Sequence, residues 1–180
     1  MKSTSFTIKP FLLRPARALY TGVVRLRSSA LVLLTHRLAL PLLKLVRQPE
    51  VFPYNAAQLQ ALPEGTLGHD LARMLEANRF ELLTHYAKHD MKHILLGYPT
   101  TDEGEVCLQA FMLGNGHLSF PVASTLLFGL CTMPEYWRSF QTAWRRGKRA
   151  PAISGWNWPA LVTLSTLELK QRIFTHNEYQ

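Results

Sequence analysis

Apolar residues recur at helical spacing along most of the chain after residue 66. Leu67, Leu71, Met74 and Leu75 form one such stripe, because apolar positions three and four residues apart share a helix face. Similar spacing, bounded by Gly, Pro and Asn, predicts further helices over residues 80–96, 105–113, 121–132, 134–147 and 159–174. Residues 48–66 contain three prolines and are expected to be a connector with a short helical piece, ending at Thr66 as the helix cap.

No stretch of the sequence shows the alternation and tight turns of a β-hairpin, and no internal repeat is present. We therefore predict an all-α fold, a single-domain irregular helical bundle of about six to eight helices. Residues 51–180 are expected to form the folded domain, preceded by an N-terminal helical arm over residues 1–50. The nearly all-apolar helix 121–132 is expected to be buried.

Basic residues are concentrated in the first quarter of the chain. Residues 1–49 carry nine Lys/Arg and no acid, whereas the remaining residues carry eleven basic and twelve acidic side chains. Because this quarter is rich in leucine and poor in aromatics, it favours an anionic membrane surface as partner over nucleic acid. Within the apolar stretch 28–47 the longest uncharged run, residues 28–36, is far shorter than the roughly 20 residues of a membrane span.

Two interpretations of residues 11–47 stay open at this point. They could be core helices that pack on the domain, with long basic side chains reaching solvent, or an amphipathic segment that lies on a bilayer. The acid-free, Arg- and Ser-containing start also resembles a mitochondrial transit peptide.

Most kinds of enzyme chemistry lack a signature in this sequence. There is no Gly-rich phosphate loop, and no serine or cysteine stands in a nucleophile motif. Cys107 and Cys131 lie in apolar stretches and are expected to be buried thiols in a reducing compartment. The basic run from Arg145 to Arg149 is expected to complement a helix dipole, with a phosphate or lipid headgroup as the sharper alternative.

One segment, residues 88–105 (KHDMKHILLGYPTTDEGE), concentrates potential metal ligands. At about 100° per helical residue, His89, Asp90 and His93 point into one quadrant. Gly97 and the following proline end this helix, and a second helix is expected to start at Asp102. Asp102 would cap it, with Glu105 as partner in a capping box, and a helical hairpin would turn Glu105 toward the histidines.

Two imidazoles with one or two carboxylates suit Zn²⁺, and Fe²⁺ or Mn²⁺ less well. Each residue alone has an ordinary explanation, since Asp90 could pair with Lys88 or Lys92 and Glu105 could serve only the cap. Their combination on consecutive helices favours a metal site. The predicted metal ligands, which are also the predicted catalytic residues, are His89, Asp90, His93 and Glu105.

Other histidines lie near this segment and have alternative explanations. His85 lies one helical turn before His89 and is interpreted as partly exposed, with a role as extra ligand or outer partner left open. The pair His69-Asp70 is interpreted as first-turn helix residues. His-Asp-x-x-His also resembles the His-Glu-x-x-His of zinc peptidases, so a zinc hydrolase is a weaker alternative function.

Three blocks of sequence resemble the fourth Coq protein family of ubiquinone (coenzyme Q) biosynthesis. They are PEGTLG at residues 63–68, HDMKHILLGYPTTDEGE at 89–105 and LQAFMLGNGHLSFP at 108–121. The similarity covers about residues 62–130 and keeps the family spacing His-Asp-x-x-His, eleven residues, then Glu. The resemblance implies an all-helical fold that binds zinc through His89, Asp90, His93 and Glu105.

The resemblance also implies a function, an enzymatic class and partners. The implied function is C1 decarboxylation, in one version oxidative, of a polyprenyl-hydroxybenzoate, which makes the chain a carbon–carbon lyase. The alternative is a non-catalytic lipid-binding scaffold with a structural metal. The implied partners are a prenylated aromatic or quinone lipid, an anionic membrane surface and other quinone-biosynthesis proteins, and a homodimer is a further candidate. The expected location is peripheral, on the cytoplasmic face of a bacterial inner membrane or the matrix side of the mitochondrial one.

Overall fold

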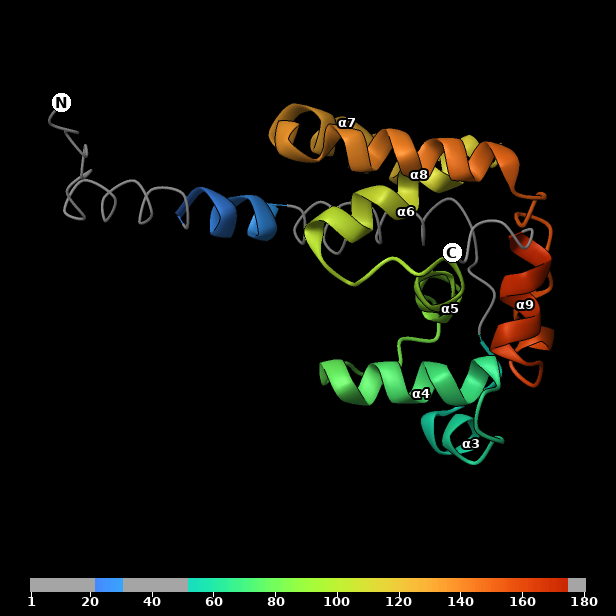
Figure 1. The fold of residues 1–180 in the computed structure, drawn as a ribbon. Coiled ribbons are helices and arrows are strands. Elements are labelled where there is room, and N and C mark those ends of the chain that lie inside the picture. The colour runs from blue at the N-terminus through green and yellow to red at the C-terminus, as the bar shows by residue number, and fades with distance from the viewer. Residues whose placement is uncertain (1–21, 31–51, 175–180) are drawn as a thin grey trace, which may run out of the picture.

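The computed structural model describes residues 22–30 and 52–174, and within them the all-α prediction is confirmed. None of these residues forms a β-strand, and Thr66 and Ser165 make a single isolated bridge. A helix over residues 22–30 precedes the labelled elements of Figure 1. In chain order these are α3 (Ala56–Gln60), α4 (Leu67–Asn78), α5 (Ala87–Leu96), α6 (Asp102–Gly114), α7 (Phe120–Thr132), η2 (Pro134–Tyr136), α8 (Trp137–Arg149), η3 (Trp158–Leu161) and α9 (Thr166–Ile173).

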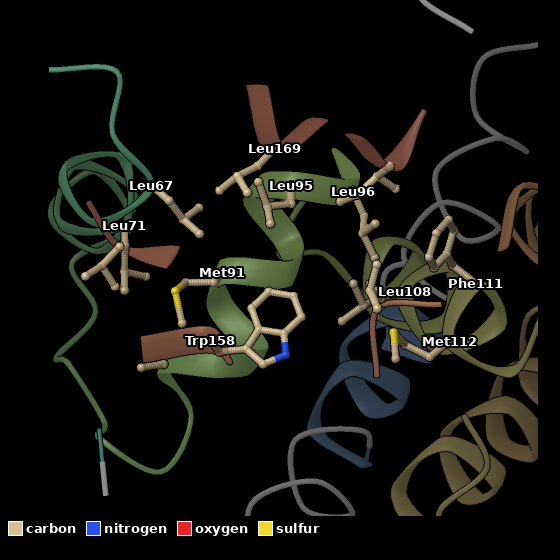
Figure 2. Packing of buried hydrophobic residues seen from close by; sticks show 14 of the residues in the cluster. Leu67, Leu71, Met91, Leu95, Leu96, Leu108, Phe111, Met112, Trp158 and Leu169 are labelled. Carbon is tan, nitrogen blue, oxygen red and sulfur yellow. The ribbon is translucent and has the colours of Figure 1, made fainter. Parts of the chain in front are cut away.

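Helix α5 lies in the middle of the folded domain. In Figure 1 it is viewed end-on between α4 on one side and the group of α6, α7 and α8 on the other, with α9 along the flank. Figure 2 shows its residues Met91, Leu95 and Leu96 in the interior, and all three are at most 1% exposed. The side chains packed around them come from four other elements and include Leu67, Leu71, Leu108, Phe111, Met112, Trp158 and Leu169.

Short-range capping signals fix the ends of the helices that carry the candidate site. Thr66 caps α4 as predicted, because its hydroxyl accepts a hydrogen bond from the His69 amide. Gly97 ends α5 in the left-handed region, at φ 74°, where glycine has no steric penalty.

The predicted capping box at Asp102 is wrong. Thr101 caps α6 instead, with its side chain accepting from the Gly104 amide at 3.2 Å. Thr101 stands one residue earlier and adopts the extended backbone that a cap requires, so the helix already includes Asp102. Glu105 is therefore released from any capping role.

Helices α6 and α8 cross with backbones nearly in contact. A Cβ atom added at Gly147 would lie 2.1 Å from the Phe111 carbonyl oxygen, and one at Gly114 would lie 2.1 Å from the Trp144 carbonyl oxygen. Glycine is thus required at both positions for this approach. The buried side chain of Asn115 holds the two helices together at one end. Its amide nitrogen donates to the carbonyls of Gly147, Ala150 and Pro151, and its oxygen accepts a hydrogen bond from the Ile153 amide.

The expectation that helix 121–132 is buried is wrong for much of its surface. In α7 one face packs on α6, where a Cβ at Gly129 would meet Val106 at 2.5 Å. The opposite face leaves Phe120, Leu127 and Leu130 between 48% and 64% exposed. Apolar composition does not determine which faces of a helix its neighbours cover.

Four smaller expectations also need correction. The predicted helix 80–96 begins only at Ala87, since residues 80–83 have no regular structure and residues 84–86 form a turn. Cys107 is buried as predicted, but Cys131 is exposed at the end of α7. The predicted helix 134–147 consists of η2 and then α8, which runs on to Arg149 with basic residues in its last turn as expected. The predicted final helix 159–174 is divided into η3 and α9, because the turn between them places Ser165 as the cap of α9.

The described part of the N-terminal region is one short helix. Over residues 22–30, Arg27 pairs with Glu135 at 2.6 Å and Ser28 donates a hydrogen bond to Asp102. Most of residues 11–47, for which the sequence leaves two interpretations open, and most of the predicted arm 1–50 lie outside the described residues. Among the residues described, no helix has the length and hydropathy needed to cross a bilayer.

Replacing Asn115 by alanine is expected to destabilise the domain by roughly 2–4 kcal/mol, since several buried backbone groups would lose their partner at once. The free energy of unfolding in denaturant measures this directly. Asn78→Ala is the matched control, because that exposed side chain bonds only within its own helix, and it should change stability by less than about 0.5 kcal/mol. Equal effects of the two substitutions would contradict the assigned role of Asn115.

Candidate metal centre

His89 and His93 form the α5 side of the candidate site. They stand one turn apart on the polar edge of this helix, with ring centroids 4.7 Å apart. Burial of Ala87, Met91 and Leu95 in the core fixes the rotation of α5 and therefore the direction of both imidazoles. The His93 side chain is 1% exposed, whereas that of His89 is 28% exposed.

Glu105 approaches the two histidines from α6. Its Oε2 lies 3.2 Å from Nε2 of His89, and its Oε1 lies 3.1 Å from Nε2 of His93. One carboxylate thus spans both imidazoles, and the ligand atoms of the three residues lie within 4.8 Å of one another. The structure therefore brings together three of the four residues predicted as ligands.

Asp90 occupies a different place from these three. Its Oδ1 lies 3.6 Å from Nδ1 of His89, on the ring nitrogen opposite the one that faces Glu105. A carboxylate there orients an imidazole and increases its basicity, as outer partners of metal-binding histidines do. Direct ligation by Asp90 stays a prediction. Within the described chain, Asp90 forms no ion pair with Lys88 or Lys92, the surface pairing that the sequence left open.

The tautomer of His93 follows from its backbone contact. Its Nδ1 lies 2.9 Å from the carbonyl oxygen of Tyr98, in the turn between α5 and α6. A carbonyl oxygen only accepts, so Nδ1 carries a hydrogen, and in the neutral imidazole Nε2 presents its lone pair toward Glu105. This Nε2 is buried and has no aligned hydrogen-bond partner, although Glu105 is near. A buried lone pair without a donor is the position that a metal ion fits.

The charges of the site depend on one another. Burial lowers the pKa of His89, but the contacts with Asp90 and Glu105 outweigh it and raise the pKa to about 9. Burial opposes ionisation of Glu105, yet His89 and His93 hold the pKa of this carboxyl well below its usual range. Burial and the two carboxylates raise the pKa of Tyr86 to about 12. Without metal, His89 therefore stays protonated at pH values below about 9.

Lys92 lies beside the ligand helix but is directed elsewhere. Its Nζ is 5.7 Å from the centroid of the Trp158 ring. Burial, and then the neighbouring charge of Lys88, lowers the pKa of Lys92 to about 8. The two histidines, Asp90 and Glu105 are therefore the groups that set the charge of the site.

The other residues considered as site candidates, His85, His69 and Asp70, are not part of the cluster of His89, His93 and Glu105. His85 lies in the turn before α5 and is exposed, so it does not continue a histidine column. His69 and Asp70 lie in the first turn of α4 as expected, and Asp70 accepts a hydrogen bond from Thr166 at 2.6 Å. Sequence reasoning missed the part played by Tyr98, because a backbone carbonyl acceptor leaves no signature in side-chain patterns.

Comparison with known proteins finds a solved structure with a similar fold. No family model matches the chain, and no curated protein does so. A solved structure that matches is the 2.85 Å crystal structure of a candidate ubiquinone biosynthesis protein from Nostoc punctiforme PCC 73102. It is 24% identical, superposes with a TM-score of 0.54, and the match covers 84% of this chain and 80% of that one. At this identity the likeness establishes the all-helical fold.

Zinc affinity is expected to rise with pH up to about 9. Metal binds the neutral imidazole, and a pKa of about 9 means that His89 must lose a proton below that pH. The apparent affinity should thus increase about ten-fold per pH unit from this group alone, and level off above its pKa. Competition with a chelator of known zinc affinity measures the slope. An affinity that is unchanged across neutral pH would contradict the proton–metal exchange.

Proposed function

We propose that this chain is a metal-dependent protein of ubiquinone or related prenyl-quinone biosynthesis, with Zn²⁺ as the ion and a polyprenyl-hydroxybenzoate as the substrate. The proposed reaction is removal of the ring C1 carboxyl group, which makes the chain a carbon–carbon lyase. The observation that carries the proposal is the convergence of His89, His93 and Glu105 at the spacing of the family that the sequence resembles. The fold of the Nostoc relative is consistent with it.

Three ligands from the described chain suit an ion with a further position open to substrate. Structural zinc sites are closed by four protein ligands, whereas catalytic sites have three and an open fourth position. His89 and Glu105 are 28% and 25% exposed, so the site can be reached from solvent. This exposure favours the catalytic proposal over the scaffold alternative. When bound, the ion would supply Lewis-acid stabilisation of the charge that develops on a carboxylate or phenolate.

The roles of the protein groups follow from their contacts. His93 holds a fixed tautomer through the Tyr98 carbonyl, and Asp90 orients His89 through the opposite ring nitrogen. Tyr86 stays protonated, with a pKa of about 12, and so remains a neutral donor beside two carboxylates. We assign Asp90 to positioning and the other three ligand candidates to the ion.

Loss of carbon dioxide leaves the bonding electron pair on C1 of the ring. In the non-oxidative version that carbon takes up a proton. In the oxidative version C1 instead receives a hydroxyl group: one atom of dioxygen becomes the hydroxyl oxygen and the other leaves as water, which requires a two-electron reductant besides dioxygen. The assay below therefore includes reactions with and without dioxygen.

We place the contact with the prenyl tail on the exposed face of α7. Phe120, Leu127 and Leu130 present an apolar surface there, and the indole of Trp137 is anchored beside it through a hydrogen bond to the Leu130 carbonyl. The proposed setting is peripheral, on an anionic membrane at the cytoplasmic face of a bacterial inner membrane. Mass spectrometry of lipids that co-purify with the protein tests whether it binds a prenylated lipid, and a prenyl or quinone-like lipid is the expected result.

His89→Ala is expected to abolish carbon dioxide release from a carboxyl-labelled polyprenyl-hydroxybenzoate and to remove stoichiometric zinc, because it deletes one of three ligands. Elemental analysis and circular dichroism of the same samples separate loss of metal from loss of fold. The exposed His85 gives the matched control, since His85→Ala deletes a histidine four residues away from the site and should leave zinc content and turnover unchanged.

Two results would decide against catalysis. If His89→Ala unfolds the domain and the purified wild-type chain shows no turnover, the metal is structural and the scaffold alternative holds. If the wild-type chain retains no metal, the site proposal itself fails.

A further inference from the structure

The turn that supplies the carbonyl partner of His93 is held in place from a distant helix. This turn, residues 97–101, joins α5 to α6 and includes Tyr98. Arg146 of α8 donates from Nη1 to the Tyr98 hydroxyl at 3.0 Å and to the Leu96 carbonyl at 3.4 Å. One guanidinium thus bonds the chain on both sides of Gly97, the residue at which α5 ends.

Arg146 is itself well anchored. Its guanidinium carbon lies 4.5 Å from the centroid of the Phe174 ring and 5.3 Å from that of Tyr98. Its helix is fixed against α6 by the glycine contacts and by the Asn115 hydrogen bonds described above. A planar guanidinium can serve two acceptors while it stacks on aromatic rings, which an ammonium group cannot do.

The other side of the turn is fixed by α6. A Cβ at Gly104 would lie 1.9 Å from the Pro99 carbonyl oxygen, so the turn rests directly on the first turn of this helix. The backbone of this turn is thus held by α6 at Pro99 and by Arg146 at Leu96 and the Tyr98 hydroxyl. Because the Tyr98 carbonyl determines which nitrogen of His93 carries the hydrogen, its position also determines where the Nε2 lone pair points.

We propose that Arg146 is a positioning residue for the candidate metal centre, acting through Tyr98 on the tautomer and orientation of His93. The inference rests on the proposed metal site. The two hydrogen bonds of Arg146 described above end on Leu96 and Tyr98, and neither involves one of the three ligand candidates. Its effect is transmitted through two hydrogen bonds, from the Arg146 guanidinium to Tyr98 and from His93 to the Tyr98 carbonyl.

The main competing explanation is that Arg146 contributes only to general stability by stacking on Phe174. Arg145 provides a matched control, because it has the same charge, lies on the same helix turn and is exposed. Arg146 is half-buried and borders an open cavity of about 450 Å³ between α6 and α8, so a shorter polar side chain at this position can be reached by solvent.

The experiment compares Arg146→Gln with Arg145→Gln by two measurements. In the metal-free protein, nitrogen NMR of the imidazole should show wild-type His93 with hydrogen on Nδ1 and the Arg146→Gln protein with a detectable Nε2–H population. Zinc affinity, measured by chelator competition, should fall about ten-fold in Arg146→Gln, the lower end of the loss seen when outer partners of ligands are removed. The visible spectrum of the Co²⁺ form should shift as well.

Further variants keep the test decisive if Arg146→Gln folds poorly. Tyr98→Phe retains the ring and the carbonyl but removes the hydroxyl that Arg146 contacts, and it should reproduce the same changes in weaker form. Combined with Arg146→Gln it should add less than the sum of the two effects, since both break one contact. Arg146→Lys should restore part of the affinity.

The outcomes separate this inference from the proposed function. If wild-type protein binds neither Zn²⁺ nor Co²⁺, the metal proposal fails, and the metal-free NMR comparison still decides the role of Arg146. If wild-type protein binds zinc and Arg146→Gln matches Arg145→Gln in tautomer and affinity, the positioning role is overturned and the metal proposal stands.

Discussion

The site depends on how a nearly inaccessible imidazole is accommodated. Burying His93 requires a partner for each ring nitrogen, because an unsatisfied polar group in the interior is costly. One nitrogen is satisfied by the Tyr98 carbonyl, while the other has only the carboxylate of Glu105 near it, without hydrogen-bond alignment. The position of α5 in the core makes this burial unavoidable. The space between Nε2 of His93 and the Glu105 carboxylate therefore suits a cation. Without one, a proton in the cluster of His89, His93 and Glu105 would have to balance the carboxylate charge.

The same constraint explains why the turn between α5 and α6 is held from several directions. A carbonyl that fixes a tautomer must itself be fixed, and a turn that starts at a glycine with positive φ has few bonds of its own. Packing of Pro99 on α6 and hydrogen bonds from Arg146 of α8 hold the turn in position. The close backbone approach at Gly114 and Gly147 thus belongs to the same arrangement as the ligands, although none of these glycines is near them in sequence.

Much of this arrangement could be predicted from short-range patterns. The stripe of Leu67, Leu71 and Leu75 gave α4, and the four-residue spacing of His89 and His93 gave a shared helix face. Features that depend on neighbours could not be predicted this way. Two adjacent residues were able to cap α6, and the choice of Thr101 follows from the conformation of the turn, which local sequence does not determine.

The exposed face of α7 and the contribution of Arg146 illustrate the same limit over longer distances. Sequence composition indicates that α7 is apolar, but the extent of its burial depends on which helices pack against it: α6 packs on the face around Gly129, while Phe120, Leu127 and Leu130 stay exposed. Arg146 belongs to a basic run that a helix dipole alone would explain. Its hydrogen-bond partners Leu96 and Tyr98, however, lie about fifty residues earlier in the chain. Spacing within one helix predicts ligands, whereas groups that position ligands arise from tertiary contacts.

The first turn of α6 connects the candidate metal centre to the N-terminal region. Asp102 accepts from Ser28 and lies 3.9 Å from Nε of Arg27, three residues before Glu105 on the same helix. Arg27 reaches Glu135 as well and places its guanidinium 6.0 Å from the Tyr136 ring, so one side chain bridges α6 and η2. Because Thr101 caps α6, Asp102 can make these contacts while Glu105 faces the histidines. Sequence reasoning placed the cap one residue too late. With Thr101 as the cap, Asp102 contacts the N-terminal helix, and Glu105 faces the proposed metal ligands His89 and His93.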